Sequence, residues 1–352
     1  MPRLYLSILA AATLAFPTPR CPSCGQSLTA KNRKRHLAFC APDLLDPDGW
    51  QSTDQSVVLQ QVEALHRPKS AERKALMLRF GPEGTASQQE VAESMGWSTR
   101  RTRDTISRLL HSIPPVADTD YPLDILHEDA ACIAVCKPGG IGVTPDHRWR
   151  GGSVLNRVIG HLGLQPGAPI PAPVHRLDMN TSGVLVFAKT QAAASRLMTS
   201  FAERQVVKVY AALLPRPPRV AEIDAPLCRV EGALHCERRV CAPGEFGQSA
   251  QSTFRVVASS PEKDGPCLVQ VRPEQGRTHQ VRVHCRAAGA PIISDELYAA
   301  SSDPPAPEQL ARHALHAQKL ICAHPTTGQK LTLVAPLPAD MLAAAQALGI
   351  SL

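Results

Sequence analysis

The sequence predicts an α+β protein in which helices flank a long mixed or antiparallel β-sheet. Short, β-branched and often alternating segments recur from residue 123 to residue 336, and segments with helical periodicity separate them. The expected strands lie at 123–137, 183–189, 206–214, 252–258, 267–273, 316–325 and 330–336, and the expected helices at 153–162, 191–204 and 277–289.

Length and composition limit the class of protein. A chain of 352 residues is too long for one small core, which predicts two or three domains. The net charge of +7 suggests a polyanionic partner, most commonly nucleic acid. No apolar run approaches the ~20 residues that span a bilayer, so we expect no membrane partner. Several of the eleven cysteines stand alone among apolar residues, which indicates reduced, buried side chains and not a disulfide framework: Cys132, Cys136, Cys267 and Cys322.

Residues 1–20 have the pattern of a targeting leader. Arg3 precedes an apolar stretch over 4–16, and the first acidic residue is Asp43. A basic protein with reduced cysteines does not suit secretion, so we expect an organelle, a plastid or a mitochondrion, and not the cytoplasm or nucleus. The stretch resembles the two-part plastid leader of some algae. An uncleaved N-terminus is the alternative.

Residues 21–40 predict a C2HC zinc knuckle, whose ligands would be Cys21, Cys24, His36 and Cys40. Two thiolates on a tight turn, followed by a His and a Cys one helical turn apart, can surround a structural zinc ion tetrahedrally. Chance cysteines inside a leader are the competing interpretation. The acidic, turn-rich residues 41–56 that follow are expected to form a linker.

Residues 57–113 predict a helix-turn-helix domain. Ser87 and Glu90 form a capping box, and Gly96 ends the helix that they begin. The pattern resembles the helix-turn-helix at the C-terminal end of bacterial sigma factors. The start of its second helix carries three arginines where such motifs contact nucleic acid: Arg100, Arg101 and Arg103. A solvated helix face is the plainer alternative. Residues 114–120 are expected to be a linker.

Two polar stretches in residues 121–352 point to chemistry. "HRLDMNTSG", residues 175–183, puts Asp178 in a loop directly before a buried strand, where a rigid scaffold can hold a reactive group. About a hundred residues later, charged and polar side chains alternate with Val281 and Val283, which is too dense for simple solvation: Arg277, His279, Gln280, Arg282 and His284.

These stretches resemble the RluA family of RNA pseudouridine synthases. The similarity runs from about Tyr121 to Pro338 through "HRLDMNTSGVLVFAK", "KVYAALL", "GRTHQVRVHCRAAGAPIISDELY" and "LHAQKLICAHPTTGQKLTLVAP". "HRLDM" is closest to the subgroup that acts on both ribosomal and transfer RNA. Three positions depart from the family: Cys136 stands for Asn, Gln275 for Thr before Gly-Arg, and Ser294 for Gly before Asp. No S4-type RNA-binding domain is recognisable.

The resemblance implies a pseudouridine synthase fold for residues 121–352 and a set of site residues. Asp178 would be the nucleophile, Arg282 its ion-pair partner, and Tyr210 would lie against the target base. Arg176 would enter the space left by a flipped nucleotide, and Leu315 would form an apolar wall. The remaining RNA contacts are assigned to His175, Arg277, His279 and Gln280. Catalysis needs no cofactor, the partner is structured rRNA or tRNA, and we expect a monomer.

Two other functions remain open at this point. One is a catalytically silent RNA-binding protein of the same fold. The other is a nucleic-acid-binding regulator in which the zinc knuckle and the helix-turn-helix carry the main function.

Overall fold

The computed structural model describes residues 70–80, 86–111, 115–145, 151–164, 168–233, 237–299, 307–308 and 310–352. The predicted leader, zinc knuckle and first linker therefore lie outside the described residues. The chain forms two compact units, residues 1–106 and 107–352. No described helix is both long enough and apolar enough to cross a membrane.

The described part of the first unit consists of α4 (Ser70–Phe80), α5 (Gln88–Met95) and α6 (Thr99–His111), and α6 continues past the unit boundary. The capping box is present, because the Ser87 hydroxyl accepts the N–H of Glu90 and the Glu90 carboxylate accepts the N–H of Ser87. Gly96 ends α5 in the left-handed conformation, with φ of 62°. The two helices joined by a short turn that the sequence predicts are thus observed. Apolar side chains from all three helices are buried: Ala75, Leu76, Val91, Ala92, Ile106 and Leu109.

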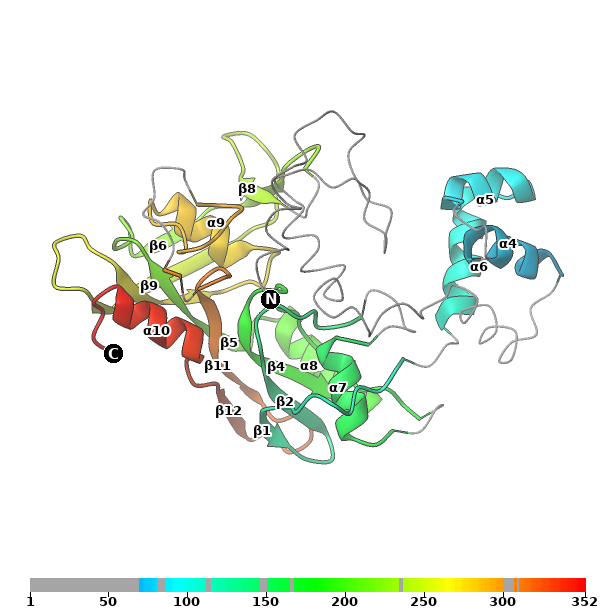
Figure 1. Cartoon of the computed structure of the whole chain (residues 1–352), viewed down its shortest axis with the longest axis horizontal. Helices are drawn as coiled ribbons and strands as arrows, with labels where there is room; N and C mark the ends of the chain where they lie inside the picture. Colours follow the sequence, from blue (N-terminus) through cyan, green and yellow to red (C-terminus); the bar gives the residue numbers. More distant parts are fainter. Residues whose placement is uncertain are drawn as a thin grey trace, which may run out of the picture. The chain divides into compact units, whose positions relative to one another are not determined.

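A ten-stranded mixed sheet forms the second unit, as the predicted α+β class requires (Figure 1). Its order is β1-β2-β4-β11-β5-β10-β9-β6, with β3 beside β4 and β12 beside β11. Every pairing is antiparallel except that of β4 with β11. The strands are β1 (Ile125–Glu128), β2 (Cys132–Lys137), β3 (Ala172–Pro173), β4 (Ser182–Ala188), β5 (Val207–Leu214), β6 (Glu222–Asp224), β9 (Gln251–Ser259), β10 (Cys267–Pro273), β11 (Leu315–Ala323) and β12 (Lys330–Val334).

The segment expected as one strand at 123–137 is a hairpin. The Asp129 carboxylate accepts the backbone N–H groups of Ala131 and Cys132, which turns the chain between β1 and β2. An Asp that bonds to the backbone two or three residues later commonly makes such a turn.

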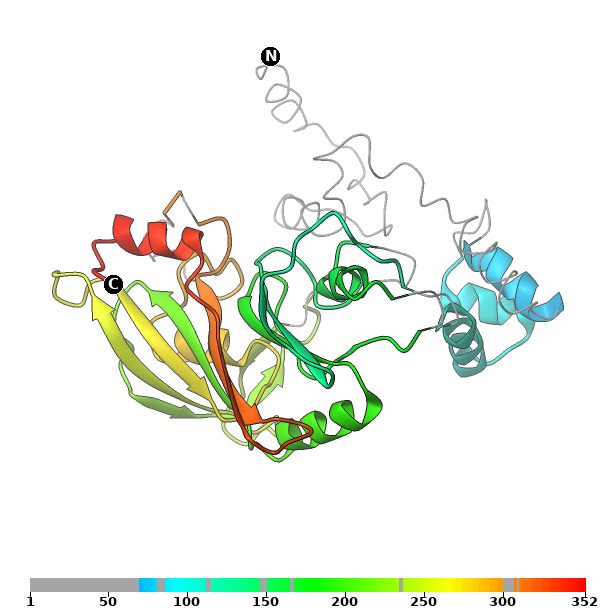
Figure 2. The ribbon, with the colours of Figure 1, turned by 90° about the horizontal axis from the view of Figure 1, so that it is seen from below.

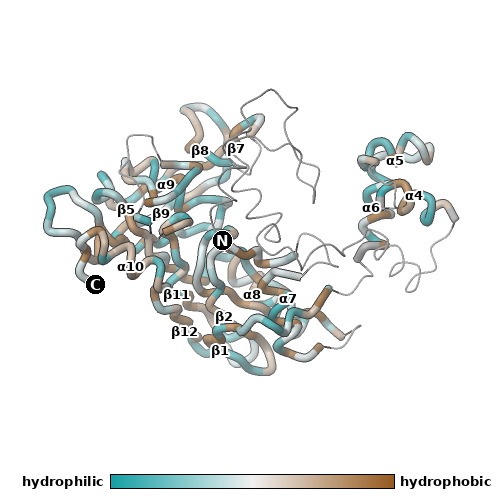
Figure 3. Tube along the Cα trace, in the orientation of Figure 1, coloured by the Kyte–Doolittle hydropathy of each residue, from teal (hydrophilic) through white to brown (hydrophobic). Residues whose placement is uncertain are grey.

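Side chains of a strand alternate between the two faces of the sheet, and helices cover both faces. Leu185 and Phe187 on β4 face the cluster that contains α7 (Val154–His161), whereas Val184 and Val186 face the cluster that contains α8 (Gln191–Ala202). These helices lie on opposite faces of the sheet (Figure 2). α9 (Gln280–Ala287) and α10 (Ala339–Ala347) pack on β5 and β10. Figure 3 shows apolar segments along several strands of the sheet. Each large apolar side chain removed from water stabilises the fold by ~1.5–3 kcal/mol.

Part of the expected second linker is attached to the rest of the second unit. Asn156 on α7 donates its side-chain N–H to the Val116 carbonyl at 2.7 Å. The carboxylate of Asp118 accepts the N–H of Gly152 at 2.6 Å. Residues 116–118 therefore pack against the start of α7.

One disulfide corrects the expectation that the cysteines are reduced. β7 (Leu227–Arg229) and β8 (Arg238–Val240) form a separate two-stranded sheet, and Cys228 is bonded to Cys241 beside it. The hairpin brings the two Cα atoms to 5.1 Å, within disulfide range, although the cysteines are distant in sequence. Cys132, Cys136, Cys267 and Cys322 are free, as expected, and so is Cys285.

Gly183→Ala is expected to destabilise the protein by several kcal/mol. Gly183 has φ of 114°, and a Cβ there would lie 2.2 Å from the Ala317 carbonyl oxygen on β11. The clash falls on backbone in the parallel pairing at the centre of the sheet, where neither strand can yield. Urea denaturation gives the free energy of unfolding. Gly328→Ala is the control, because Gly328 also has a positive φ but no neighbour within 4 Å, so it should lose only ~1–2 kcal/mol from strain. Equal losses would contradict the clash.

Candidate active site

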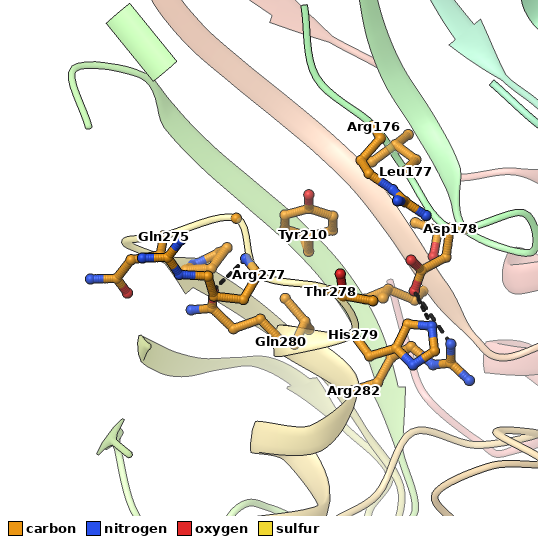
Figure 4. Close-up of a pocket in the computed structure, with 15 residues that line it drawn as sticks. Arg176, Leu177, Asp178, Tyr210, Gln275, Arg277, Thr278, His279, Gln280 and Arg282 are labelled. Atoms are coloured by element: carbon orange, nitrogen blue, oxygen red, sulfur yellow. Dashed lines mark hydrogen bonds and ion pairs between the residues drawn. The ribbon is translucent and has the colours of Figure 1, made fainter. Parts of the chain in front are cut away.

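A pocket opens where four segments of the second unit meet. The loop before β4, strand β5, the start of β11 and the segment entering α9 form its walls, and Figure 4 shows Tyr210 between the first and the last of these. All of the catalytic and RNA-contact residues proposed from the sequence line this pocket except His175: Arg176, Asp178, Tyr210, Arg277, His279, Gln280, Arg282 and Leu315.

Arg282 connects two carboxylates at the base of the pocket. Its Nε and Nη2 donate to the two oxygens of Asp295, each at 2.7 Å. Its remaining nitrogen, Nη1, donates to Asp178 Oδ2 at 3.3 Å, which is the pairing implied by the resemblance. The Arg282 side chain is only 6% exposed. A guanidinium so deep in the protein needs carboxylate partners, and the bidentate geometry is the stronger of the two contacts.

Asp178 stays ionised in this environment. Burial on its own raises the pKa of the carboxyl, but the charge that His279 carries when protonated, the charge of Arg282 and the hydrogen bond from Arg282 hold that pKa below its ordinary value. Burial lowers the pKa of His279 to about 4, so this ring is neutral at pH 7. Arg282 is therefore the permanent charge that keeps Asp178 a carboxylate. Both recorded contacts, from Arg282 and His279, reach the same oxygen, Oδ2.

Tyr210 on β5 is a neutral phenol. Burial, and then the charge of Asp178, raise the pKa of Tyr210 above its ordinary value. A phenol with a raised pKa can donate a proton or pack against a ring, but it is not a phenolate base at neutral pH. Its ring packs against the apolar clusters on both sides of the pocket, which fixes its position.

A buried lysine holds the loop that carries Asp178. The ammonium of Lys137, at the end of β2, donates to the carbonyls of Pro138, Ile141 and Met179 at 2.7–2.8 Å. Met179 directly follows Asp178, so the lysine ties the loop with Asp178 to the turn after β2. Burial, followed by the charge of Arg312, lowers the pKa of Lys137 to about 7.

The segment before β11 holds the next two residues of the loop. Arg312 donates to the carbonyl of Asn180 at 2.9 Å. The Thr181 hydroxyl lies 2.9 Å from the ring nitrogen of the buried His313. The loop that carries Asp178 is thus held at Asn180 and Thr181 by side chains from outside the loop.

Two of the expected RNA contacts have partners within the protein. His175 lies outside the pocket, where its Nε2 accepts the N–H of Val186 at 3.1 Å and its ring stacks on Phe201. Gln280 lines the pocket but is buried, and its amide bonds to the backbone of Arg277 and of Gln251. Both side chains hold neighbouring segments in place.

Arg176 and Leu315 line the pocket and are placed to contact a ligand. Arg176 is exposed, and within the described part of the chain its guanidinium has no hydrogen bond or ion pair. Leu315 is buried at the start of β11 and presents an apolar wall. Arg277 donates from Nε to the carbonyl of Ser249 at 3.1 Å, and it is half-buried.

Two departures from the family pattern differ in how well they fit the local geometry. Gln275 accepts the N–H of Gln251 through its side chain and a hydrogen bond from Lys208 through its carbonyl. Ser294 adopts φ of 61°, the left-handed conformation that a glycine would favour. Its hydroxyl is buried without a hydrogen-bond partner.

A second polar group of the second unit has the composition of a metal site: His127, Asp129, Cys132 and His324. Asp129 Oδ2 lies 3.0 Å from Nε2 of His127 and 2.6 Å from Nε2 of His324. The Nδ1 atom of His324 accepts backbone N–H groups from residues 326 and 327, so its Nε2 carries the ring hydrogen. A metal-bound histidine donates from its second nitrogen, which is the opposite arrangement. The group is a hydrogen-bonded contact between the β1–β2 and β11–β12 turns.

The sequence analysis missed the role of Asp295, the strongest partner of Arg282. A signal was available, because an arginine between Val281 and Val283 on a helix is expected to be buried and to need a carboxylate. Asp295 is a nearby acid in "SDELY". No comparable signal identified Arg312 or His313 as supports of the loop.

Ser294→Gly is expected to raise the free energy of unfolding by about 1 kcal/mol. Glycine has no strain at this positive φ, and the substitution removes a buried hydroxyl that lacks a partner. Chemical denaturation measures the change. Ser260→Gly, which removes another buried unpartnered hydroxyl without a positive φ, separates the two contributions. A less stable Ser294→Gly protein would show that the serine conformation is not strained.

Comparison with known proteins identifies the family. The model of the RNA pseudouridylate synthase family matches residues 131–287. An RNA pseudouridine synthase of Bacillus subtilis, YhcT, is 36% identical over 221 residues, which is 62% of this chain and 70% of that protein. Ribosomal large subunit pseudouridine synthase D of Vibrio parahaemolyticus is 34% identical over 65% of this chain and 71% of its own. The structure of human RNA pseudouridylate synthase domain containing 1 covers 62% of this chain and 87% of that chain, with 25% identity and a TM-score of 0.51. The chain belongs to the RluA family of RNA pseudouridine synthases.

Proposed function

We propose that the protein isomerises specific uridines in structured rRNA or tRNA, with Asp178 as the nucleophile. The observation that carries this is the contact of Arg282 with one oxygen of Asp178. Within the described residues no partner is recorded for the other oxygen, Oδ1, which leaves it for the sugar. In the reaction the N1–C1′ bond breaks, the base turns, and a C5–C1′ bond forms. The C5 proton is lost and N1 gains one, so atoms and charge balance without a cofactor.

The other pocket residues have complementary roles in this proposal. Tyr210 packs against the base while it is detached, and its neutral hydroxyl can donate a hydrogen bond to a carbonyl of uracil. Arg176 fills the space that the flipped nucleotide leaves, which offsets the few kcal/mol of lost stacking. Leu315 bounds the base on its apolar side.

The RNA class, the compartment and the N-terminal zinc site are parts of the proposal. The name of the Vibrio relative supports rRNA as the substrate class. We infer a monomeric enzyme of an organelle, with a structural zinc in the knuckle at 21–40, because the sequence of that region has the leader and ligand patterns described above.

Asp178→Asn is expected to lower turnover by at least about 10³-fold, because an amide is not a nucleophile. RNA affinity should stay within about threefold, since the fold and the RNA contacts are kept. The experiment maps pseudouridines in nuclear, mitochondrial and plastid RNA from cells that lack the protein and are complemented with either form. Asp264→Asn, at an exposed carboxylate, is the matched control.

Each result has a defined consequence for the function. Loss of a site that only the wild type restores gives the substrate and the compartment. Restoration by Asp178→Asn would refute the role of Asp178 and support an RNA-binding protein of the same fold. No lost site in any compartment would refute the enzymatic proposal.

The arginine face of α6 is a second proposed RNA contact. Arg100, Arg101 and Arg103 are exposed on the first turns of α6, and Arg101 lies over the ring of Trp97 at 4.5 Å. Thr102, Ile106 and Leu109, on the other side of the helix, are buried and fix which face is presented. Such a face can bind phosphates, and the chain belongs to a family that acts on RNA.

Replacing these three arginines with alanine is expected to weaken binding of the mapped target RNA by tenfold or more. The slope of log affinity against log salt should fall by about 0.7–0.9 for each lost phosphate contact. Filter binding of the full-length protein measures both. The control removes three exposed lysines, Lys74, Lys263 and Lys330, so an equal loss there would mean that only net charge matters. A preference for duplex DNA over the target RNA would favour the regulator instead.

A further inference from the structure

The hydrogen positions around Tyr298 can be assigned from its partners. The Tyr298 hydroxyl oxygen accepts the backbone N–H of Arg238 at 3.0 Å and lies 2.7 Å from Nδ1 of His279. Tyr298 is only 4% exposed, and burial raises its pKa to about 12, so it keeps its hydrogen. Among the described residues, Nδ1 of His279 is the only acceptor recorded for that hydrogen. An undonated buried hydroxyl is costly, so Tyr298 donates to Nδ1.

The tautomer of His279 follows from this assignment. A neutral imidazole carries one hydrogen, and because Nδ1 accepts, the hydrogen is on Nε2. Nε2 lies 3.8 Å from Asp178 Oδ2, the oxygen that Arg282 also contacts. The ring therefore presents an N–H to the carboxylate without adding a second positive charge. In the other tautomer, a nitrogen lone pair would face a carboxylate.

The backbone supports a specific role for His279. It is the residue before α9, it has φ of 57°, and its side chain makes no capping bond. A non-glycine residue in this conformation costs on the order of 1 kcal/mol or more, and such strain concentrates at functional sites. The surroundings also hold Tyr298. The backbone N–H groups of Leu297 and Tyr298 both donate to Asp295 Oδ1, and the Tyr298 ring lies 5.0 Å from the Arg282 guanidinium.

We propose that Tyr298 is a positioning residue that locks His279 in the Nε2–H tautomer, so that His279 and Arg282 together hold Oδ2 of Asp178 and direct Oδ1 to the sugar. The proposal deepens the proposed function and rests on Asp178 acting as the nucleophile. The 3.8 Å separation closes to a hydrogen bond when RNA fills the pocket, since catalytic hydrogen bonds are often long before substrate binds. This arrangement assigns His279 as a donor, and it rules out a base at Nε2 in the same state.

The first test reads the tautomer directly. Nitrogen NMR of the full-length protein, labelled with ¹⁵N in histidine, distinguishes Nε2–H from Nδ1–H, and the spectrum of His279→Asn identifies the signal. We chose asparagine because it tolerates a positive φ and keeps the helix start. We expect Nε2–H in the wild type and a mixture of tautomers in Tyr298→Phe. A wild-type signal from Nδ1–H, or an unchanged signal in Tyr298→Phe, overturns the proposal.

The second test measures kcat and KM. Tritium release from 5-³H-uridine in the mapped RNA should show kcat lowered about tenfold in Tyr298→Phe, with KM within about twofold. Tyr121→Phe removes a hydroxyl from a half-exposed ring elsewhere and should change neither. Adding Tyr298→Phe to His279→Asn should cause no further loss, because the hydroxyl acts through the ring. If the two single losses in kcat multiply in the double variant, Tyr298 acts independently of His279.

The outcomes separate this proposal from the proposed function. If Asp178→Asn retains turnover, the nucleophile assignment fails, although the tautomer in the RNA-free protein can still be measured. If Tyr298→Phe does not fold, the wild-type spectrum and the kcat of His279→Asn still decide, since wild-type turnover in that variant overturns the role of the ring.

Discussion

The active site depends on the buried guanidinium of Arg282 between two carboxylates. Removing such charges from water costs several kcal/mol for each ion, and only well-formed hydrogen bonds offset that cost. Asp295 supplies these bonds through two contacts of 2.7 Å, while the contact to Asp178 is longer, at 3.3 Å. Three charged groups then carry one net negative charge. Asp295 is fully buried and doubly bonded, so the less constrained charge is that of Asp178, which faces the pocket.

The topology of the sheet explains why distant segments converge on that charge. β4 and β11 are parallel neighbours, so both begin at the same edge of the sheet. The loop with Asp178 enters β4 there, and the segment that supports this loop enters β11. At the boundary His316 donates from Nε2 to the Ala335 carbonyl, so its Nδ1 accepts the hydroxyl of Ser182 at 2.8 Å. One parallel pair in an otherwise antiparallel sheet therefore brings the loop with Asp178 and the segment that supports it together.

The sequence was sufficient for the features that repeat or that resemble a family. Alternation and helical periodicity predicted the α+β class, and the motifs predicted eight of the residues that line the pocket. It was insufficient where a role depends on what lies opposite in space. His175 and Gln280 are polar residues in polar motifs, and only the fold shows that backbone groups occupy them. The Cys228–Cys241 bond likewise depends on a short hairpin that periodicity did not indicate, and the β1–β2 turn on one Asp side chain.

The proposed function assigns much of the recognition of a target uridine to contacts with RNA outside the pocket. Lys137, Arg312 and His313 fix the loop on both sides before any substrate is present, so the protein has little to rearrange around Asp178. In the proposed mechanism the cost of extruding a base then falls on interactions with the RNA outside the pocket. Arg176 has no partner within the described residues. In the proposed mechanism it offsets part of the lost stacking energy only where the RNA backbone lets a nucleotide leave its stack. Selectivity for a uridine would therefore follow RNA shape, because the pocket itself can accept any uracil.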